Sequence, residues 1–398
     1  MKLKDIFEKP ISGEWGKEVG EGEKGSKVIR TTNFTNIGRL DLSSIVERDI
    51  DSIKHENKKL KFGDIIIEKS GGSPTQPVGR VVIFEETNED VYFCNNFTSI
   101  LRPNKNIVPK FGLYLLKNLY NKKKVLKFQN KTTGIINIKL NDYLNNTEIT
   151  IPNLEVQNRI AEVLNKTQEL IDKRKEQIES LDELVKSKFI EMFGDPVKNP
   201  LGWKLKPFLD SGNCKNGMNF SASESGVELQ YVGVGDFKDL SKIDNVNTLG
   251  KVSLNKIPSN EYILQDGDIL FVRSNGNKDL VGRCLAIYPK GVPTTYSGFC
   301  IRYRKTDDKL EIPYLLQVLK TDSMRKNMAG RGANIQNLNQ QILGSLMIPV
   351  PPIELQSQFT NFIEHVDKLK FEMEKSLKEL EDNFNSLMQK AFRGELFK

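Results

Sequence analysis

The chain has 398 residues and a formal net charge of +7, a length that suggests two or three domains. Hydrophobic residues make up 38% and charged residues 28%, a composition that excludes a wholly disordered chain. The basic balance is compatible with nucleic acid or another anionic partner, although many other proteins are mildly basic.

The few histidines and cysteines argue against a metal site. There are only two histidines, and the four cysteines form no CxxC pair. We therefore expect reduced, mostly buried cysteines, as in a cytoplasmic protein. No apolar run is long enough to cross a membrane, and no apolar signal core follows Met1. The expected location is the cytoplasm.

The first part of the chain, 1–152, predicts a domain of mixed α and β structure. Short β-rich runs occur at 64–68 and 78–84, separated by clusters of Gly, Asn, Ser and Pro. Asp64 follows a glycine at a strand start, where an aspartate more often supports a turn than catalyses. Ile151-Pro152 ends this part, because proline disfavours helix in the residue before it.

A long helix is predicted from about 154 to 192. This span contains neither Gly nor Pro, and apolar residues such as Ile160, Leu164 and Ile171 recur at helical spacing. The sequence Gly194-Asp195-Pro196 is a typical stop signal.

The second half of the chain repeats the first at a distance of about 200 residues. Gly63-Asp64 returns as Gly267-Asp268, Gly79-Arg80 as Gly282-Arg283, and Ile151-Pro152 as Ile348-Pro349. A second helix is predicted from about 354 to 392, with apolar residues in steps of three and four from Val366 to Leu387. Each helix could pack on its own domain, but both stripes are narrow, so we expect the two helices to pair with each other.

This plan of domain, Ile-Pro and long helix, occurring twice, resembles the specificity subunit of type I restriction-modification enzymes. The resemblance is carried by Ile151-Pro152-Asn153-Leu154-Glu155-Val156-Gln157, by its counterpart from Ile348 to Gln356, and by Gly202-Trp203. The N-terminal edge departs from the family, because Lys2-Leu3-Lys4 lacks a Gly-Trp lead. The implied fold is α+β, with two similar globular α/β DNA-recognition domains separated by two long helices that form an antiparallel coiled coil.

The resemblance also implies a division of labour. It assigns 1–152 and 195–350 to two target recognition domains, and 153–194 and 351–398 to two spacer helices. In the family, each domain reads one half of a bipartite site on double-stranded DNA. Two methyltransferase subunits and the restriction (motor) subunits are the implied partners. S-adenosylmethionine, ATP and Mg²⁺ are expected on those partners, with no cofactor on this chain and no membrane.

The sequence lacks three motifs that would indicate catalysis on DNA or nucleotides. An adenine methyltransferase needs an Asn/Asp-Pro-Pro-Tyr/Phe loop, and the nearest match, Val350-Pro351-Pro352-Ile353, lacks both functional ends. Gly20 to Lys27 has the glycine spacing of a phosphate-binding loop but inverts its Gly-Lys-Ser order. No proline precedes an aspartate, as the common metal-dependent nucleases require. We therefore expect a subunit without a catalytic site.

Three kinds of polar segment are candidates for DNA contact, because lysine and arginine bind phosphates while amides, hydroxyls and arginine read base edges. The first is the loop after each Gly-Asp strand, together with the Gly-Arg that follows: Lys69, Ser70, Ser73 and Arg80, and Arg273, Ser274, Asn275, Asn277, Lys278 and Arg283. The second precedes each Ile-Pro: Lys131, Thr132, Thr133 and Asn137, and Arg325, Arg331, Asn334, Gln336 and Asn337. The third is the acid-free lysine run of Lys117, Lys122, Lys123, Lys124, Lys127 and Lys131.

Each segment has a plainer interpretation, as a hairpin turn, a capped turn or a solvated helix face. The whole chain also has an alternative, a non-catalytic coiled-coil scaffold without sequence-specific DNA binding. Salt-dependent DNA affinity would separate the scaffold from the reader, because only the reader releases counterions from phosphates.

Overall fold

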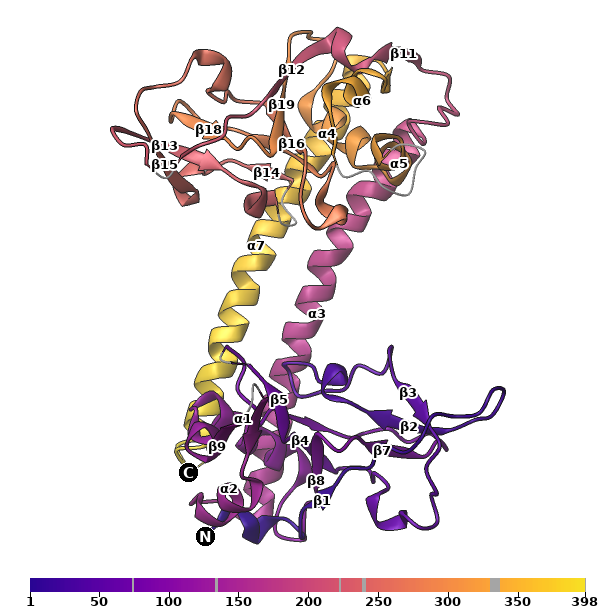
Figure 1. Ribbon diagram of the computed structural model, residues 1–398, viewed down its shortest axis with the longest axis vertical. Helices are drawn as coiled ribbons and strands as arrows, with labels where there is room; N and C mark the ends of the chain where they lie inside the picture. Colours follow the sequence, from indigo (N-terminus) through magenta and orange to yellow (C-terminus); the bar gives the residue numbers. More distant parts are fainter. Residues whose placement is uncertain (74, 133–134, 222, 238–240, 330–336, 398) are drawn as a thin grey trace. The chain divides into compact units, whose positions relative to one another are not determined.

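The computed structural model describes residues 1–73, 75–132, 135–221, 223–237, 241–329 and 337–397. The chain divides into two compact units: unit 1 comprises Met1–Lys175 with Ser376–Lys398, and unit 2 comprises Glu176–Lys375. Two long helices, α3 (Leu154–Phe193) and α7 (Ile353–Ala391), each contribute residues to both units (Figure 1).

Unit 1 contains a four-stranded antiparallel sheet in the order β1-β8-β4-β6 and two three-stranded sheets, β3-β2-β7 and β5-β10-β9. Its strands are β1 (Ile11–Ser12), β2 (Ser26–Ile29), β3 (Val46–Arg48), β4 (Ile65–Glu68), β5 (Ser70–Gly72), β6 (Val81–Ile83), β7 (Tyr92–Cys94), β8 (Thr98–Leu101), β9 (Gln129–Thr132) and β10 (Ile135–Ile138). Its shorter helices are α1 (Pro109–Asn121) and α2 (Leu140–Asn146). The central strand β4 is buried along its whole length, which explains its run of three isoleucines.

Unit 2 contains a five-stranded sheet, β12-β19-β16-β17-β14, a three-stranded sheet, β15-β13-β18, and the pair β11-β20. Its strands are β11 (Lys204–Pro207), β12 (Gly212–Asn216), β13 (Val227–Val232), β14 (Lys242–Ile243), β15 (Gly250–Leu254), β16 (Asp268–Val272), β17 (Cys284–Ile287), β18 (Thr294–Tyr296), β19 (Cys300–Lys305) and β20 (Met347–Val350). Its shorter helices are α4 (Ile312–Lys320), α5 (Asp322–Ala329) and α6 (Gln340–Gly344).

The sheet topology confirms the internal repeat. The order β1-β8-β4-β6 of unit 1 returns in unit 2 as β12-β19-β16-β17, with β14 added at the edge. The smaller sheet also returns, since β2 pairs with β3 antiparallel and with β7 parallel, as β13 does with β15 and β18. Mixed pairing in the same places makes the two units copies of one fold.

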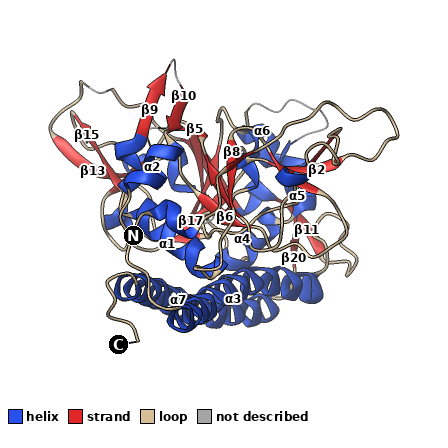
Figure 2. Cartoon of the chain, turned by 90° about the horizontal axis from the view of Figure 1, so that it is seen from below, coloured by secondary structure: helices blue, strands red, loops and turns tan. Residues whose placement is uncertain are grey.

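The two long helices pack against each other in antiparallel fashion within each unit. In unit 1, Lys175 of α3 forms an ion pair of 2.9 Å with Glu381 of α7. In unit 2, Asp182 of α3 accepts hydrogen bonds from Lys370 of α7, both at 2.8 Å. Residues late in one helix thus lie beside residues early in the other, and the helices lie side by side in Figure 2. The expected antiparallel coiled coil is confirmed.

Pairing with the other helix and packing on a globular region are not alternatives here. Leu164 of α3 and Met388 of α7 belong to the same hydrophobic core as Phe111 of α1. Conversely, two stripe positions, Leu170 and Leu369, are 54% and 47% exposed. Apolar residues of both helices therefore build the core of unit 1, whereas Leu170 and Leu369 remain about half exposed to solvent.

Each long helix is fixed to its domain by a buried glutamine in its first turn. The Gln157 side chain accepts a hydrogen bond from the backbone N–H of Val108 at 2.9 Å and donates to the carbonyls of Asn106 and Pro152. Gln356 accepts from the N–H of Glu311 at 2.9 Å and donates to the carbonyls of Lys309 and Pro351. Val108 and Glu311 are the residues that precede α1 and α4, so the same bond set recurs in both units.

The cysteines agree with the sequence-based expectation. All four are free; Cys94, Cys284 and Cys300 are buried, and Cys214 is partly buried. Burial raises the pKa of the Cys94 and Cys284 thiols to about 11, so both are protonated at neutral pH. No helix in the described ranges is both long and apolar enough to span a bilayer.

Candidate nucleic-acid interface

The Gly-Asp pair at the start of each central strand builds a buried ion pair. Asp64 is 1% exposed and accepts two hydrogen bonds from the Arg102 guanidinium, at 2.9 and 2.8 Å. Asp268 is also 1% exposed and accepts two from Arg304, at 2.8 and 2.7 Å. Each aspartate also accepts a backbone N–H three residues earlier, which closes the turn. Both carboxylates therefore hold a turn and an arginine in place, as the turn interpretation predicts.

In unit 1, the polar loop after the Gly-Asp strand joins the segment that precedes Ile-Pro. β5 pairs antiparallel with β10, with a register shift between Ile136 and Asn137. The Ser70 hydroxyl donates a hydrogen bond to the Asn137 side-chain oxygen, and the carbonyl of Lys69 accepts from the N–H of Ile138 at 2.9 Å. Two segments 67 residues apart therefore form one polar junction.

Unit 2 forms the same junction, with an arginine in place of the lysine and again a serine and an asparagine. Ser274 and Asn337 form an antiparallel bridge, and the carbonyl of Arg273 accepts a hydrogen bond from the N–H of Leu338 at 2.8 Å. We call the two sets, Lys69-Ser70-Asn137 and Arg273-Ser274-Asn337, the junctions of the two units. Their members belong to separate candidate segments of the sequence, and no sequence pattern predicts that these segments meet.

Other candidates from the loops after the Gly-Asp strands, in both units, have structural partners. The Arg80 guanidinium donates two hydrogen bonds of 3.0 Å to Glu68 and one to the carbonyl of Thr31. Ser73 accepts the N–H of Gln76 and lies beside Thr75. Arg283 stands where the chain enters β17, and its carbonyl accepts from the N–H of Val272. DNA contact by these three residues stays a prediction.

The asparagines of the second loop shape its turn. The Asn275 side chain accepts the N–H of Asn277, and the Asn277 side chain accepts the N–H of Asp279. Arg325 on α5 donates to the carbonyls of Asp279 and Val281, at 3.3 and 3.4 Å. The turn interpretation thus holds for both asparagines. Their side-chain oxygens accept these two hydrogen bonds, and their side-chain NH₂ groups take no part in them.

The lysine run divides into a partly buried residue, Lys117, and an exposed part. Lys117 lies within α1, where its ammonium group donates to the carbonyl of Ile37, and burial lowers its pKa to about 8. Lys122, Lys123 and Lys124 are exposed at the carboxyl end of α1, where their charges also favour the helix dipole. Only the exposed part is placed to meet phosphates.

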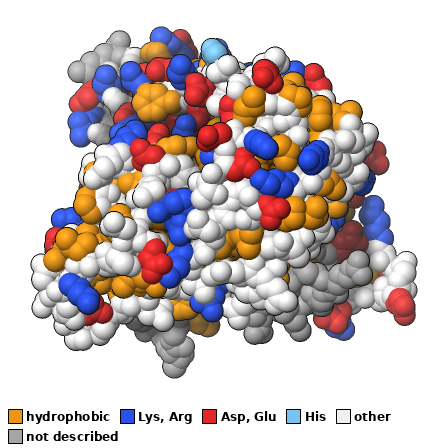
Figure 3. Space-filling view, turned by 90° about the horizontal axis from the view of Figure 1, so that it is seen from above, with side chains coloured by type: hydrophobic (Ala, Val, Ile, Leu, Met, Phe, Trp, Pro, Cys, Tyr) orange, Lys and Arg blue, Asp and Glu red, His pale blue; other side chains and the backbone are white. Residues whose placement is uncertain are grey.

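Seven of the candidate DNA-contact residues lie, wholly or with their side chains, outside the described part of the structure. Thr133, Arg331, Asn334 and Gln336 lie outside the described residues, and the side chains of Lys131, Thr132 and Lys278 are not described either. In the face of the molecule seen in Figure 3, lysine and arginine side chains are dispersed among uncharged surface. Among the residues that the structure describes, this face therefore carries no single dense block of basic side chains.

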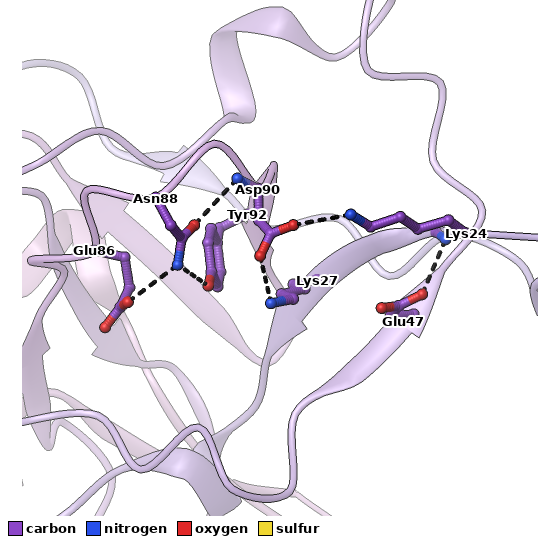
Figure 4. A network of polar contacts seen from close by, with 8 residues as sticks. Lys24, Lys27, Glu47, Glu86, Asn88, Asp90 and Tyr92 are labelled. Carbon is purple, nitrogen blue, oxygen red and sulfur yellow. Dashed lines mark hydrogen bonds and ion pairs between the residues drawn. The ribbon is translucent and has the colours of Figure 1, made fainter.

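The glycine-rich stretch that resembles a phosphate-binding loop is held by acids. Lys24 and Lys27 both form ion pairs with Asp90, at 3.2 and 2.5 Å, and the N–H of Gly25 donates to Glu47 (Figure 4). The Lys27 and Lys24 hydrogen bonds lower the pKa of the Asp90 carboxyl. Both lysines are therefore paired with an acid of the same unit. Within the described ranges, His, Cys, Asp and Glu nowhere gather in threes fit to hold a metal ion.

Comparisons with known proteins agree with this architecture. The family model described as the type I restriction modification DNA specificity domain matches residues 1–180 and 203–382. The chain is 26% identical to the type I restriction enzyme StySPI specificity subunit of Salmonella potsdam and 25% identical to the EcoKI specificity subunit of Escherichia coli K12. Both alignments cover 93% of this chain and 82% of the relative.

Solved structures show the same fold. A chain from a structural study of complex assembly and conformational transition of the type I R-M system aligns with a TM-score of 0.62, at 18% identity, over 100% of this chain and 97% of that one. The type I restriction-modification S subunit from M. genitalium aligns with a TM-score of 0.54, at 17% identity, over 98% and 95%. With a family model that matches both repeats, the chain belongs to the type I restriction modification DNA specificity family.

Proposed function

We propose that this chain is the sequence-specific DNA-binding subunit of a type I restriction-modification complex, and that each unit reads one half of a bipartite site. One observation carries the proposal: the junctions have the same backbone arrangement in both units, with a serine and an asparagine in each. The basic residue and the loop that follows it differ, with Lys69 and Gly71-Gly72-Ser73 in one unit and Arg273 and Asn275-Gly276-Asn277 in the other. Two readers of one design with different chemistry are what two different half-sites require.

Partner subunits supply the chemistry in this proposal. Two methyltransferase subunits bind S-adenosylmethionine and methylate adenine, and restriction subunits use ATP and Mg²⁺ to cleave unmodified DNA. The chain itself contributes recognition: exposed lysines such as Lys122 to Lys124 neutralise phosphates, and junction side chains address base edges. DNA contact by each nominated residue is part of the proposal.

Methylation mapping tests the proposal directly. The chain is expressed with its methyltransferase in a host whose genome lacks that modification, and modified adenines are mapped. The expected result is one split motif with a constant gap, present only when the chain is expressed. A scaffold without DNA recognition leaves the adenine pattern unchanged, and that result would overturn the proposal.

Binding at several salt concentrations provides a second readout. The complex of this chain with its methyltransferase is titrated with duplexes that carry or lack the mapped motif. The proposal expects affinity that falls steeply with salt for both duplexes, and a preference for the motif of at least about a thousandfold. Equal affinity for both duplexes would contradict sequence-specific reading.

A further inference from the structure

Both units leave a phenylalanine exposed at the same place in the fold. Phe97 is 47% exposed and precedes β8, and Phe299 is 59% exposed and precedes β19. The strands that follow are buried, including Ile100 and Ile301 at 0% exposure. Single exposed hydrophobic residues are ordinary on proteins. An exposed aromatic at one position of both units, with different preceding residues (Asn95-Asn96 and Ser297-Gly298), calls for a cause.

The strand register places each phenylalanine opposite the basic residue of its junction. In unit 1, the ladder of β4 and β8 ends at Glu68 and Thr98, and just beyond it the N–H of Lys69 donates to the Phe97 carbonyl at 2.7 Å. In unit 2, the ladder of β16 and β19 ends at Val272 and Cys300, and just beyond it the N–H of Arg273 donates to the Phe299 carbonyl at 2.8 Å. The backbone of each phenylalanine is therefore adjacent to the backbone of the basic residue of its junction.

The basic residue lies between the phenylalanine and the polar pair of the junction. Through its N–H, Lys69 bonds to Phe97; through its carbonyl, it bonds to Ile138, the neighbour of Asn137. Arg273 likewise connects Phe299 with Leu338, the neighbour of Asn337. Each unit therefore brings an exposed ring, a cation and an amide together on three adjoining backbone segments.

We propose that Phe97 and Phe299 contact bases of the half-site that their own unit reads, which rests on the proposed function. A phenyl ring has no donor for a phosphate, and the apolar groups that duplex DNA offers are the thymine methyl and the base faces. The neighbouring cation suits the phosphate or a guanine edge. A ring and a cation together can distinguish one base sequence from another. A cation that contacts only phosphates supplies affinity for any sequence.

The test uses three alanine variants in the full complex with the methyltransferase. Phe97→Ala and Phe299→Ala remove the rings, and Phe62→Ala is the matched control, since Phe62 is 65% exposed at the opposite end of β4. Affinity is measured for the mapped site and for duplexes with one half-site scrambled. Phe97→Ala is expected to reduce the preference for one half-site about tenfold, the scale of one base contact, and Phe299→Ala the preference for the other.

The outcomes separate this inference from the proposed function. Phe62→Ala and the wild type are expected to behave alike, and the salt dependence of unspecific binding is expected to be the same in all four proteins. If the wild type prefers its site and Phe97→Ala and Phe299→Ala retain the full preference, the ring contact is wrong and the reading function stands. If the variants only weaken assembly with the methyltransferase, the rings face a protein partner and the inference is overturned. If the wild type itself shows no preference for the mapped site, the proposed function is wrong.

Discussion

At the scale of single residues, the buried pair of Asp268 and Arg304 controls the stability of unit 2. We expect Arg304→Leu to lower the free energy of unfolding of unit 2 by about 3 to 5 kcal/mol, because Asp268 remains 1% exposed with its charge uncompensated. Trp203 lies in unit 2, so its fluorescence in a Trp15→Phe background reports the denaturant midpoint of that unit.

An exposed ion pair in the same unit is the control. Lys251 and Glu228 are 3.1 Å apart, with side chains 59% and 61% exposed. Lys251→Met is expected to change stability by less than about 0.5 kcal/mol, because solvent screens this pair. Equal effects of the two substitutions would mean that burial of Asp268 is not the cause.

Lys117 gives unit 1 a pH dependence. Burial lowers its pKa from 10.5 to about 8, so between these values the unfolded chain binds more protons than the folded one, and stability rises with pH. Relative to Lys117→Met, the wild type is expected to gain about 2 to 3 kcal/mol of unfolding free energy between pH 7 and pH 10. Denaturation followed by Trp15 in a Trp203→Phe background measures the difference, and a flat difference would show that Lys117 is already solvated.

Sequence reasoning at this scale reached individual residues but not their partners. It assigned Asp64 to a turn, which is correct, but missed Arg102, because the two are 38 residues apart and no local pattern links them. The same limit hid the meeting of Ser70 with Asn137 and the exposure of Phe97 and Phe299. Strand register decides all three, and register depends on contacts across the fold.

At the scale of elements, Gln157 determines how firmly α3 is attached to unit 1. We expect Gln157→Leu to cost at least about 2 kcal/mol, because the N–H of Val108 and the carbonyls of Asn106 and Pro152 lose their partner inside the protein. Hydrogen exchange of the first turns of α3 and α1 is expected to speed up together, since one side chain ties both helix starts.

An exposed glutamine tests whether a leucine alone causes such an effect. Gln389 lies on the exposed face of α7, so Gln389→Leu is expected to leave stability within about 0.5 kcal/mol of the wild type. Protection of α3 that survives Gln157→Leu unchanged would show that hydrophobic packing alone holds the helix.

The helices were the most predictable elements. The expected spans 154–192 and 354–392 differ by one residue at each misplaced end from Leu154–Phe193 and Ile353–Ala391. Gly194 ends α3 with a φ of 74°, in the left-handed region that glycine tolerates. The second Ile-Pro pair does not lie between two elements, because Pro349 lies inside β20. A proline is possible there because β20 pairs only with β11 among the strands described and is therefore an edge strand.

At the scale of the whole molecule, the length of the helix pair is expected to determine the gap between the half-sites. Deleting seven residues from each helix, 176–182 and 372–378, removes about 10 Å of helix, which corresponds to about three base pairs. The mapped methylation motif should keep both half-sites and shorten its gap by that amount. A change of sequence within a half-site would contradict this role for the helices.

The core of unit 1 contains residues from both ends of the chain, which affects how the protein folds during synthesis. Its hydrophobic core includes Met388 and Ala391, and Phe392 packs on Phe111 with ring centroids 5.3 Å apart. The ribosome therefore completes all of unit 2 before it delivers the residues from Ser376 onward that unit 1 needs. At about 5 to 20 residues per second, the first unit waits roughly 10 to 40 s with an open apolar face. During that interval the nascent chain is a natural client for chaperones, and slow translation of the second half extends its exposure.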